Sequence, residues 1–204
     1  MVERTKLENP IRIGVLSDTH IPDRVGDFHP DVLPTIQKLN VDLIIHAGDI
    51  SIPDVLQRLE QIAPVHAVRG NRDWWQIRNL PTFKEITLKE VKILITHGYG
   101  NLFSYLWDKI PNWLFGYRYE HFVKKFSKLG QNFDIIIFGH SHRPENRWKD
   151  GRLYFNPGSA YDPSQKQLGP SIGLIEIGEG KFIKSEIIYL TAMKWVKNHW
   201  TRDK

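Results

Sequence analysis

The stretch IRIGVLSDTH, residues 11–20, places an apolar run directly before two side chains that can bind a metal ion, Asp18 and His20. Four more apolar runs are each followed by at least one side chain of this kind: VDLIIHAGD (41–49), VHAVRGNRD (65–73), VKILITHG (91–98) and FDIIIFGHSH (133–142). In open α/β sheets, ligands bind beyond the carboxyl ends of the strands. We therefore expect these five motifs to converge at one site, although they span most of the chain.

The β-rich runs predict a mixed α/β fold. Helix-like stretches at 30–39 and 53–62 separate the first three runs, which favours parallel strands covered on both faces. Later runs follow one another more closely, and turn residues at 149–151 and 178–180 predict hairpins. The sum predicts two packed sheets flanked by helices. The predicted strands are 11–16, 42–46, 65–68, 83–88, 91–96, 133–138, 153–155, 172–177 and 182–190.

Composition limits the class of protein. The 204 residues suit one domain, 1–204, with an aromatic helical insertion at about 101–129. The chain has no cysteine and no apolar run long enough for a membrane span, so we expect a cytoplasmic protein without a membrane partner. The net charge of +5 favours an anionic substrate, and nucleic acid is a possible but less expected one because the chain shows no nucleic-acid-binding motif.

Two segments leave alternatives open. The aromatic insertion is expected to wall the active-site cleft; alternatively it forms a contact in a homo-oligomer or, less in keeping with its prolines and acidic residues, a membrane-surface helix. Residues 193–200 have apolar positions near helical spacing and predict a docking helix, with a phosphate-binding basic tail as the alternative.

The side chains in the five motifs are those of a metal site. Asp, Asn and His are the ligands expected for divalent ions of intermediate hardness. Asp18 and His20 are two residues apart, as are His140 and His142. An extended chain would present both members of such a pair on one side. Glycines beside these residues permit sharp turns and close backbone approach.

In order and spacing, the motifs resemble the calcineurin-like metallophosphoesterase superfamily. They resemble most its small single-domain prokaryotic phosphodiesterases, to which a retromer scaffold subunit is related. The resemblance runs from Ile11 to about Leu190 and includes the sequence NPGS at 156–159. It implies a two-sheet αββα sandwich and two metal ions. The first ion would be held by Asp18, His20, Asp49 and His142, and the second by Asp49, Asn71, His97 and His140, with Asp49 bridging.

This ligand set predicts phosphodiester hydrolysis. Two carboxylates leave about two positive charges uncancelled on a pair of divalent ions, which attracts a phosphate. Ions about 3.5–4 Å apart can hold the attacking hydroxide between them. We expect Mn²⁺, with Zn²⁺, Fe²⁺, Ni²⁺ and Mg²⁺ as alternatives. Asn71, Arg72 and His97 are the candidate catalytic residues.

Arg72 stands where many superfamily members have a histidine that assists the leaving group. A guanidinium cannot act as a general acid, but it can stabilise charge on phosphoryl oxygens. We therefore expect water to protonate the leaving group, and aryl phosphodiesters to react faster than alkyl ones.

Two other functions use the same motifs. One is a phosphomonoesterase or nucleotide phosphatase with the same centre. The other is a non-catalytic protein-binding scaffold like the retromer subunit. Scaffold relatives typically lose metal ligands, whereas all seven are present here.

The remaining polar residues of interest are given structural roles. His46 and His66 are expected to be packed and hydrogen-bonded in the core. His29 is expected to be an exposed loop residue, with contact to the substrate as the alternative. Asp73 is expected either to orient Asn71 or Arg72 or to begin a helix as its N-cap. His121 is assigned no role.

Overall fold

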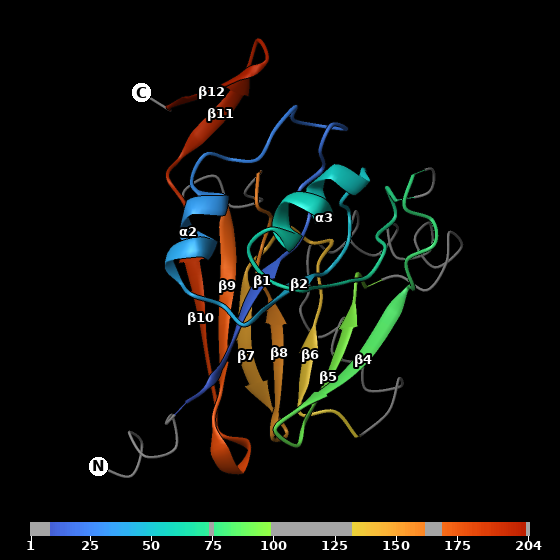
Figure 1. The fold of residues 1–204 in the computed structure, drawn as a ribbon, viewed down its shortest axis with the longest axis vertical. Coiled ribbons are helices and arrows are strands. Elements are labelled where there is room, and N and C mark those ends of the chain that lie inside the picture. Colours follow the sequence, from blue (N-terminus) through green and yellow to red (C-terminus); the bar gives the residue numbers. More distant parts are fainter. Residues whose placement is uncertain (1–8, 74–75, 99–131, 162–168, 203–204) are drawn as a thin grey trace, which may run out of the picture.

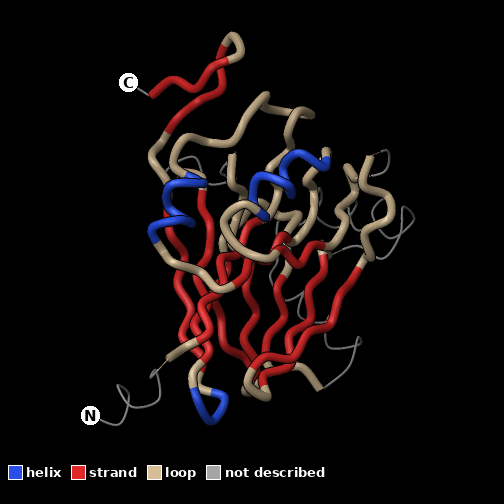
Figure 2. Tube along the Cα trace, viewed as in Figure 1, coloured by secondary structure: helices blue, strands red, loops and turns tan. Residues whose placement is uncertain are grey.

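Two five-stranded sheets pack face to face in the computed structural model, which describes residues 9–73, 76–98, 132–161 and 169–202 (Figure 1). Strands dominate these residues, and the helices are few and short (Figure 2). The predicted two-sheet α/β sandwich is confirmed. The predicted insertion at 101–129 lies outside the described residues, and so does His121.

The first sheet has the strand order β10-β9-β1-β2-β3. Its parallel part consists of β1 (Ile11–Leu16), β2 (Leu43–His46) and β3 (Val65–Ala67), connected through α2 (Val32–Lys38) and α3 (Pro53–Glu60). β9 (Ser171–Ile177) runs antiparallel to β1 and pairs with β10 (Ile183–Tyr189). A short 3₁₀ turn, Glu179–Lys181, occupies the turn predicted between β9 and β10.

The second sheet has the strand order β4-β5-β6-β8-β7. β5 (Val91–Thr96), β6 (Ile135–Ile137) and β8 (Arg152–Asn156) are parallel. β4 (Phe83–Leu88) and β7 (Glu145–Lys149) pair with them in antiparallel fashion at the two edges. The sequence did not predict β7, because its residues after Glu145 are polar or exposed and show no buried run.

Successive side chains of the central strands point alternately into two hydrophobic cores. Ile13, Val15 and Ile45 point between the sheets, where they pack with Ile93 and Phe155 of the second sheet. Leu16 and Ile44 belong to the other core, which also contains Val32 and Ile36 of α2 and Val55 and Leu59 of α3. All of these side chains are fully buried. The parallel strands of the first sheet therefore lie between a helical layer and the second sheet, as continuous apolar runs require.

The prediction of a helix at 193–200 is wrong. These residues form a hairpin of β11 (Met193–Val196) and β12 (His199–Arg202), which projects from the end of the molecule (Figure 1). Lys197 and Asn198 both have positive φ angles, of 48° and 64°, which is the backbone of a tight hairpin turn. Trp195 and Trp200 face each other across the strands, with ring centroids 5.4 Å apart. Cross-strand aromatic pairing and a two-residue turn therefore override the apparent helical spacing.

Among the described residues, no helix has the length and apolar character needed to cross a bilayer.

Candidate metal centre

The loops that follow β1, β2, β3, β5 and β6 bring the five predicted motifs together. These loops come from both sheets and lie beyond the carboxyl ends of the strands (Figure 1). Their polar side chains gather there. Two groups of three side chains could each hold a metal ion. Within each group the potential ligand atoms lie within 4.8 Å of one another.

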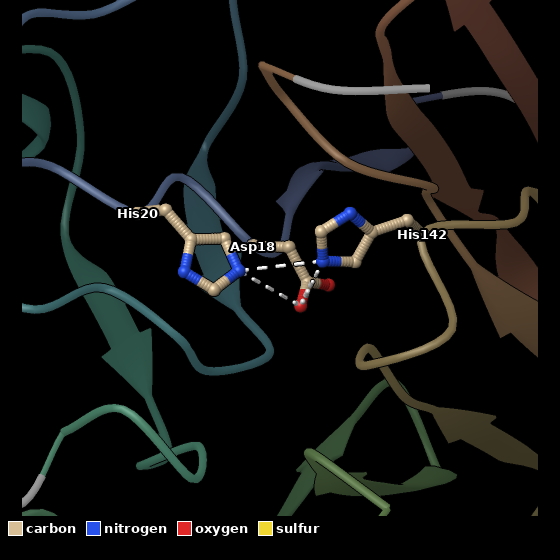
Figure 3. Close-up of side chains that lie close together, drawn as sticks. All are labelled: Asp18, His20 and His142. Atoms are coloured by element: carbon tan, nitrogen blue, oxygen red, sulfur yellow. Dashed lines mark hydrogen bonds and ion pairs between the residues drawn. The ribbon is translucent and has the colours of Figure 1, made fainter. Parts of the chain in front are cut away.

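The first group consists of Asp18, His20 and His142 (Figure 3). His142 Nε2 lies 3.3 Å from Asp18 Oδ1 and 3.3 Å from His20 Nε2. His20 Nε2 lies 3.8 Å from the same Asp18 oxygen. Asp18 and His20 are buried, and His142 is partly exposed. Two imidazole nitrogens and a carboxylate oxygen thus point at one small volume, as the ligands of a bound cation do.

The second group consists of Asp49, His97 and His140. His97 Nε2 lies 3.4 Å from Asp49 Oδ2. His140 Nδ1 lies 3.0 Å from Asn71 Oδ1, so the structure brings the amide of Asn71 to this group as well.

Asp49 lies between the two groups. Its Oδ2 is 3.4 Å from His97 Nε2 and 3.5 Å from His20 Nε2. Its Oδ1 accepts a hydrogen bond of 2.8 Å from the backbone N–H of Arg72. One carboxylate oxygen therefore faces ligands of both groups, which is the position that a bridging ligand needs.

Two buried atoms support a bound cation. Asp18 Oδ1 and His97 Nε2 have no hydrogen-bond partner among the described residues, although both are shielded from solvent. Asp18 is fully buried and lies 3.9 Å from His97 across the centre. Because an unpaired buried polar atom is unfavourable, and a charged one more so, these atoms fit ligands of a divalent ion.

The backbone at these residues differs from the sequence expectation. Asp18, His20, Asp49, His140 and His142 have φ angles of 53°, 50°, 56°, 74° and 54°. They occupy the left-handed region, which is uncommon for residues other than glycine. The paired ligands therefore do not converge through the alternation of an extended strand. Strained turns after the strands aim them instead, a feature that clusters at functional sites.

Without bound metal, the histidines of the centre differ in pKa. Burial alone would lower the pKa of His97, but the carboxylates of Asp49 and Asp18 raise it to about 10. Burial and the neighbouring His97 cation lower the pKa of His140 to about 3. Burial raises the pKa of Asp18, yet the adjacent His142 and His97 outweigh this effect and hold it well below its usual range. His140 thus presents a neutral nitrogen, whereas His97 must release a proton to bind a metal.

A shell of hydrogen bonds orients the ligands. His97 Nδ1 contacts the carbonyl of Ala47 at 2.7 Å, which leaves Nε2 facing the centre. Ser17 Oγ donates to Asp18 Oδ2 at 2.5 Å, and the backbone N–H of His140 donates to the same oxygen at 3.0 Å. Asn156, from the NPGS sequence, donates to the carbonyl of Gly139 at 3.0 Å. Such contacts fix tautomers and ring orientation at metal sites.

Three of the other predictions need correction. His29 is buried rather than exposed, because its Nε2 lies 3.0 Å from the carbonyl of Thr191 and its ring packs on Trp200. Among the described residues, Asp73 makes no hydrogen bond to the side chain of Asn71 or Arg72, and the start of the helix that it was expected to cap lies outside them. Its carboxylate accepts hydrogen bonds from the backbone N–H groups of Ile50, Ser51 and Gly70, and so ties the Asp49 loop to the Asn71 loop.

His46 and His66 behave differently from each other. His46 is fully buried and bonded to Thr19 and Gly48, as predicted. His66 is only half-buried, and its Nδ1 has no hydrogen-bond partner among the described residues, so that part of the prediction is wrong.

A pocket of about 200 Å³ opens over the centre. Its lining includes Arg72 and two residues that the sequence analysis missed, Arg24 and the half-buried Tyr161. Asp23, which the sequence analysis also missed, pairs with both of these arginines. Arg24 and Asp23 lie a few residues beyond the first motif, and Tyr161 lies just beyond NPGS. Proximity to a motif was the available signal, and it does not specify which side chains turn toward the pocket.

The chain is similar to known proteins in sequence and in fold. Residues 11–180 match the calcineurin-like phosphoesterase superfamily domain. A probable metallophosphoesterase of Methanothermobacter thermautotrophicus is 32% identical over 176 residues, which cover 86% of this chain and 91% of the relative. A phosphodiesterase of Methanocaldococcus jannaschii is 26% identical over 168 residues, covering 72% and 83%.

The crystal structure of Vps29 complexed with zinc from Entamoeba histolytica is similar in fold, with a TM-score of 0.65 and 22% identity over 87% of this chain and 98% of that one.

Proposed function

The chain belongs to the calcineurin-like phosphoesterase superfamily, and from this premise we propose that it hydrolyses phosphodiesters with two divalent metal ions. The observation that carries the proposal is the position of Asp49, whose Oδ2 faces His20 and His97 at 3.5 and 3.4 Å. A single oxygen between two ligand groups suits a pair of ions that share a carboxylate. The name of the Methanocaldococcus relative supports a diester over other phosphoesters.

The proposed ligands divide between the two ions as the resemblance implies. Asp49 serves both, and each ion receives three further side chains. The first ion takes Asp18, His20 and His142, and the second takes Asn71, His97 and His140. Nitrogen and oxygen donors of this kind suit Mn²⁺, which we propose as the metal, and they also accept Zn²⁺, Fe²⁺, Ni²⁺ or Mg²⁺.

When bound, the two ions would supply a nucleophile by lowering the pKa of a water and would neutralise the phosphoryl oxygens. The chain supplies positive charge around them. Arg72 lines the pocket with its backbone anchored to Asp49, and Arg24 lines it from the loop after His20. Both guanidiniums attract an anion, and Arg72 is placed to stabilise charge on the phosphate. The volume of about 200 Å³ suits a small phosphoester.

The test is turnover of aryl phosphodiesters and the matching monoesters, each assayed with Mn²⁺, Zn²⁺, Fe²⁺, Ni²⁺ and Mg²⁺. We expect metal-dependent hydrolysis with diesters preferred. Preference for monoesters would support a phosphatase with the same centre. Absence of turnover with every metal would support a scaffold.

Asp49→Asn tests the bridging role directly. The substitution keeps the shape of the side chain and removes its charge, so turnover should be abolished while thermal unfolding stays cooperative. Wild-type turnover in this variant would refute a bridging carboxylate.

A further inference from the structure

Asp23, in the loop after His20, contributes no ligand to either group, yet its carboxylate lies beside one of the proposed ligands. Its Oδ2 lies 3.5 Å from His20 Nδ1, 3.7 Å from Arg72 Nη1 and 3.9 Å from Arg24 Nε. One oxygen therefore stands within ion-pair distance of a proposed metal ligand and of two arginines that line the pocket.

His20 needs a partner of this kind. Its Nε2 faces Asp18, Asp49 and His142 and is the nitrogen directed at the metals. Its Nδ1 must then carry the ring proton, since a neutral imidazole has one donor and one acceptor nitrogen. Nδ1 is buried and has no hydrogen-bond partner in the part of the chain that the structure describes. Asp23 Oδ2 is the carboxylate oxygen beside it, at 3.5 Å.

The same carboxylate restrains Arg72. The backbone N–H of Arg72 is fixed to Asp49, but its side chain is 42% exposed and needs a contact to hold it over the pocket. Asp23 supplies that contact, and 33% of its side chain remains exposed to solvent.

We propose that Asp23 is a positioning residue: it orients His20 for metal binding through Nδ1 and holds Arg72 beside the phosphate. The inference rests on the proposed function, because it needs the two metal ions. In this arrangement the carboxylate of Asp23 contacts both a metal-binding histidine and an arginine of the pocket. One side chain therefore affects both metal binding and phosphate binding.

Calorimetric titration of Mn²⁺ into the metal-free protein tests the first part without relying on turnover. Asp23→Ala removes the carboxylate beside His20 Nδ1, and we expect the affinity of one ion to fall about 10- to 100-fold, the usual effect of losing such a partner. Asp23→Asn retains a neutral acceptor and should recover part of the loss, which a purely structural role would not predict.

Asp27→Asn is the matched control. Asp27 lies in the same loop and also pairs with an arginine, Arg58 at 2.6 Å, but it has no contact with His20 among the interactions of the described residues. The Asp27→Asn variant should bind Mn²⁺ with the affinity of the wild type. Thermal unfolding of all three variants shows whether the loop remains folded.

The outcomes separate the two proposals. A wild-type protein that binds no Mn²⁺ contradicts the proposed function. If the wild type binds two ions and the Asp23→Ala variant binds them with equal affinity, only the proposed role of Asp23 is overturned.

The link to Arg72 is tested by inhibition with inorganic phosphate. If Asp23 acts through Arg72, the change that Asp23→Ala makes in the inhibition constant should vanish in an Arg72→Ala background. A change of the same size in both backgrounds would overturn the link.

Discussion

Gly70→Ala should disable the centre although it replaces none of the proposed ligands. Gly70 precedes Asn71 and lies against Asp49. A Cβ at this position would come within 2.1 Å of Asp49 Oδ1 and 2.3 Å of Asp49 N. The first clash could be relieved by turning the carboxylate, but the second is with backbone and cannot.

The required displacement follows from these distances. Ordinary contact begins at 3.4 Å, so Asp49 must move away from residue 70 by about 1.1 Å at its backbone nitrogen and about 1.3 Å at its carboxylate. Metal–ligand distances tolerate only about 0.2 Å. A misplacement of about 1 Å can reduce turnover about 100-fold, or roughly 2.7 kcal/mol of transition-state stabilisation. The strain should also destabilise the fold by about 1–3 kcal/mol.

The assays are Mn²⁺ titration, kcat/KM on an aryl phosphodiester, and urea unfolding. Gly14→Ala is the control, because its Cβ would meet Val41 Cγ1 at 3.4 Å, which is ordinary contact. That variant should keep wild-type metal affinity and turnover. If Gly70→Ala also stays within about threefold of wild type in both, the inference that Asp49 must hold this position to bridge the ions is wrong.

Three further predictions concern the loops, the charge and the leaving group. Asp73→Ala should lower the free energy of unfolding by about 2–4 kcal/mol in urea, because one buried and two partly buried backbone N–H groups lose their acceptor. An equal loss in Asp42→Ala, whose carboxylate accepts an exposed N–H of Arg12, would contradict this. In metal-free protein the raised pKa of His97, about 10, contributes stability that is complete below pH 6.5 and lost as the pH rises toward 10, on the order of 3–5 kcal/mol. Urea unfolding at pH 6.5, 8 and 9.5 should show this decline in the wild type, and a His97→Gln variant with the same slope would disprove it. With Arg72 unable to donate a proton, aryl phosphodiesters should be hydrolysed faster than alkyl ones, and equal rates under conditions where chemistry limits turnover would rule this out.

Long buried runs made the central strands predictable, since β1, β2, β5 and β6 pack apolar side chains on both faces. The edge elements lacked this signal. β7 shows the burial of an exposed edge strand, with only Glu145 buried. The C-terminal hairpin depends on Trp200, whose Nε1 donates to the carbonyl of Asp27 at 3.2 Å, a contact between residues 173 apart. Local periodicity contains no information about such a partner.

The site also contains residues that the sequence predicted and residues that it did not. The order of the motifs predicted which residues could gather, because parallel strands deliver their following loops to one edge. It could not predict Asp23 or Tyr161, which belong to no motif and face the ligands only through the paths of their loops. Nor could it predict His29, which reads as a loop residue until Thr191 and Trp200 cover it.

The left-handed backbone at the proposed ligands is held by hydrogen bonds between loops. Asp18 N donates to the carbonyl of Gly48 at 2.9 Å, and His20 N donates to that of Asp49 at 3.0 Å. Each strained residue opposes folding by about 1–3 kcal/mol, so these bonds and the surrounding core must offset the strain. None of these bonds involves a metal ion. We therefore expect a chelator to remove the ions while the protein keeps a single cooperative unfolding transition and its near-ultraviolet circular dichroism. Loss of that spectrum on chelation would show that the ions, rather than the loops, hold the centre together.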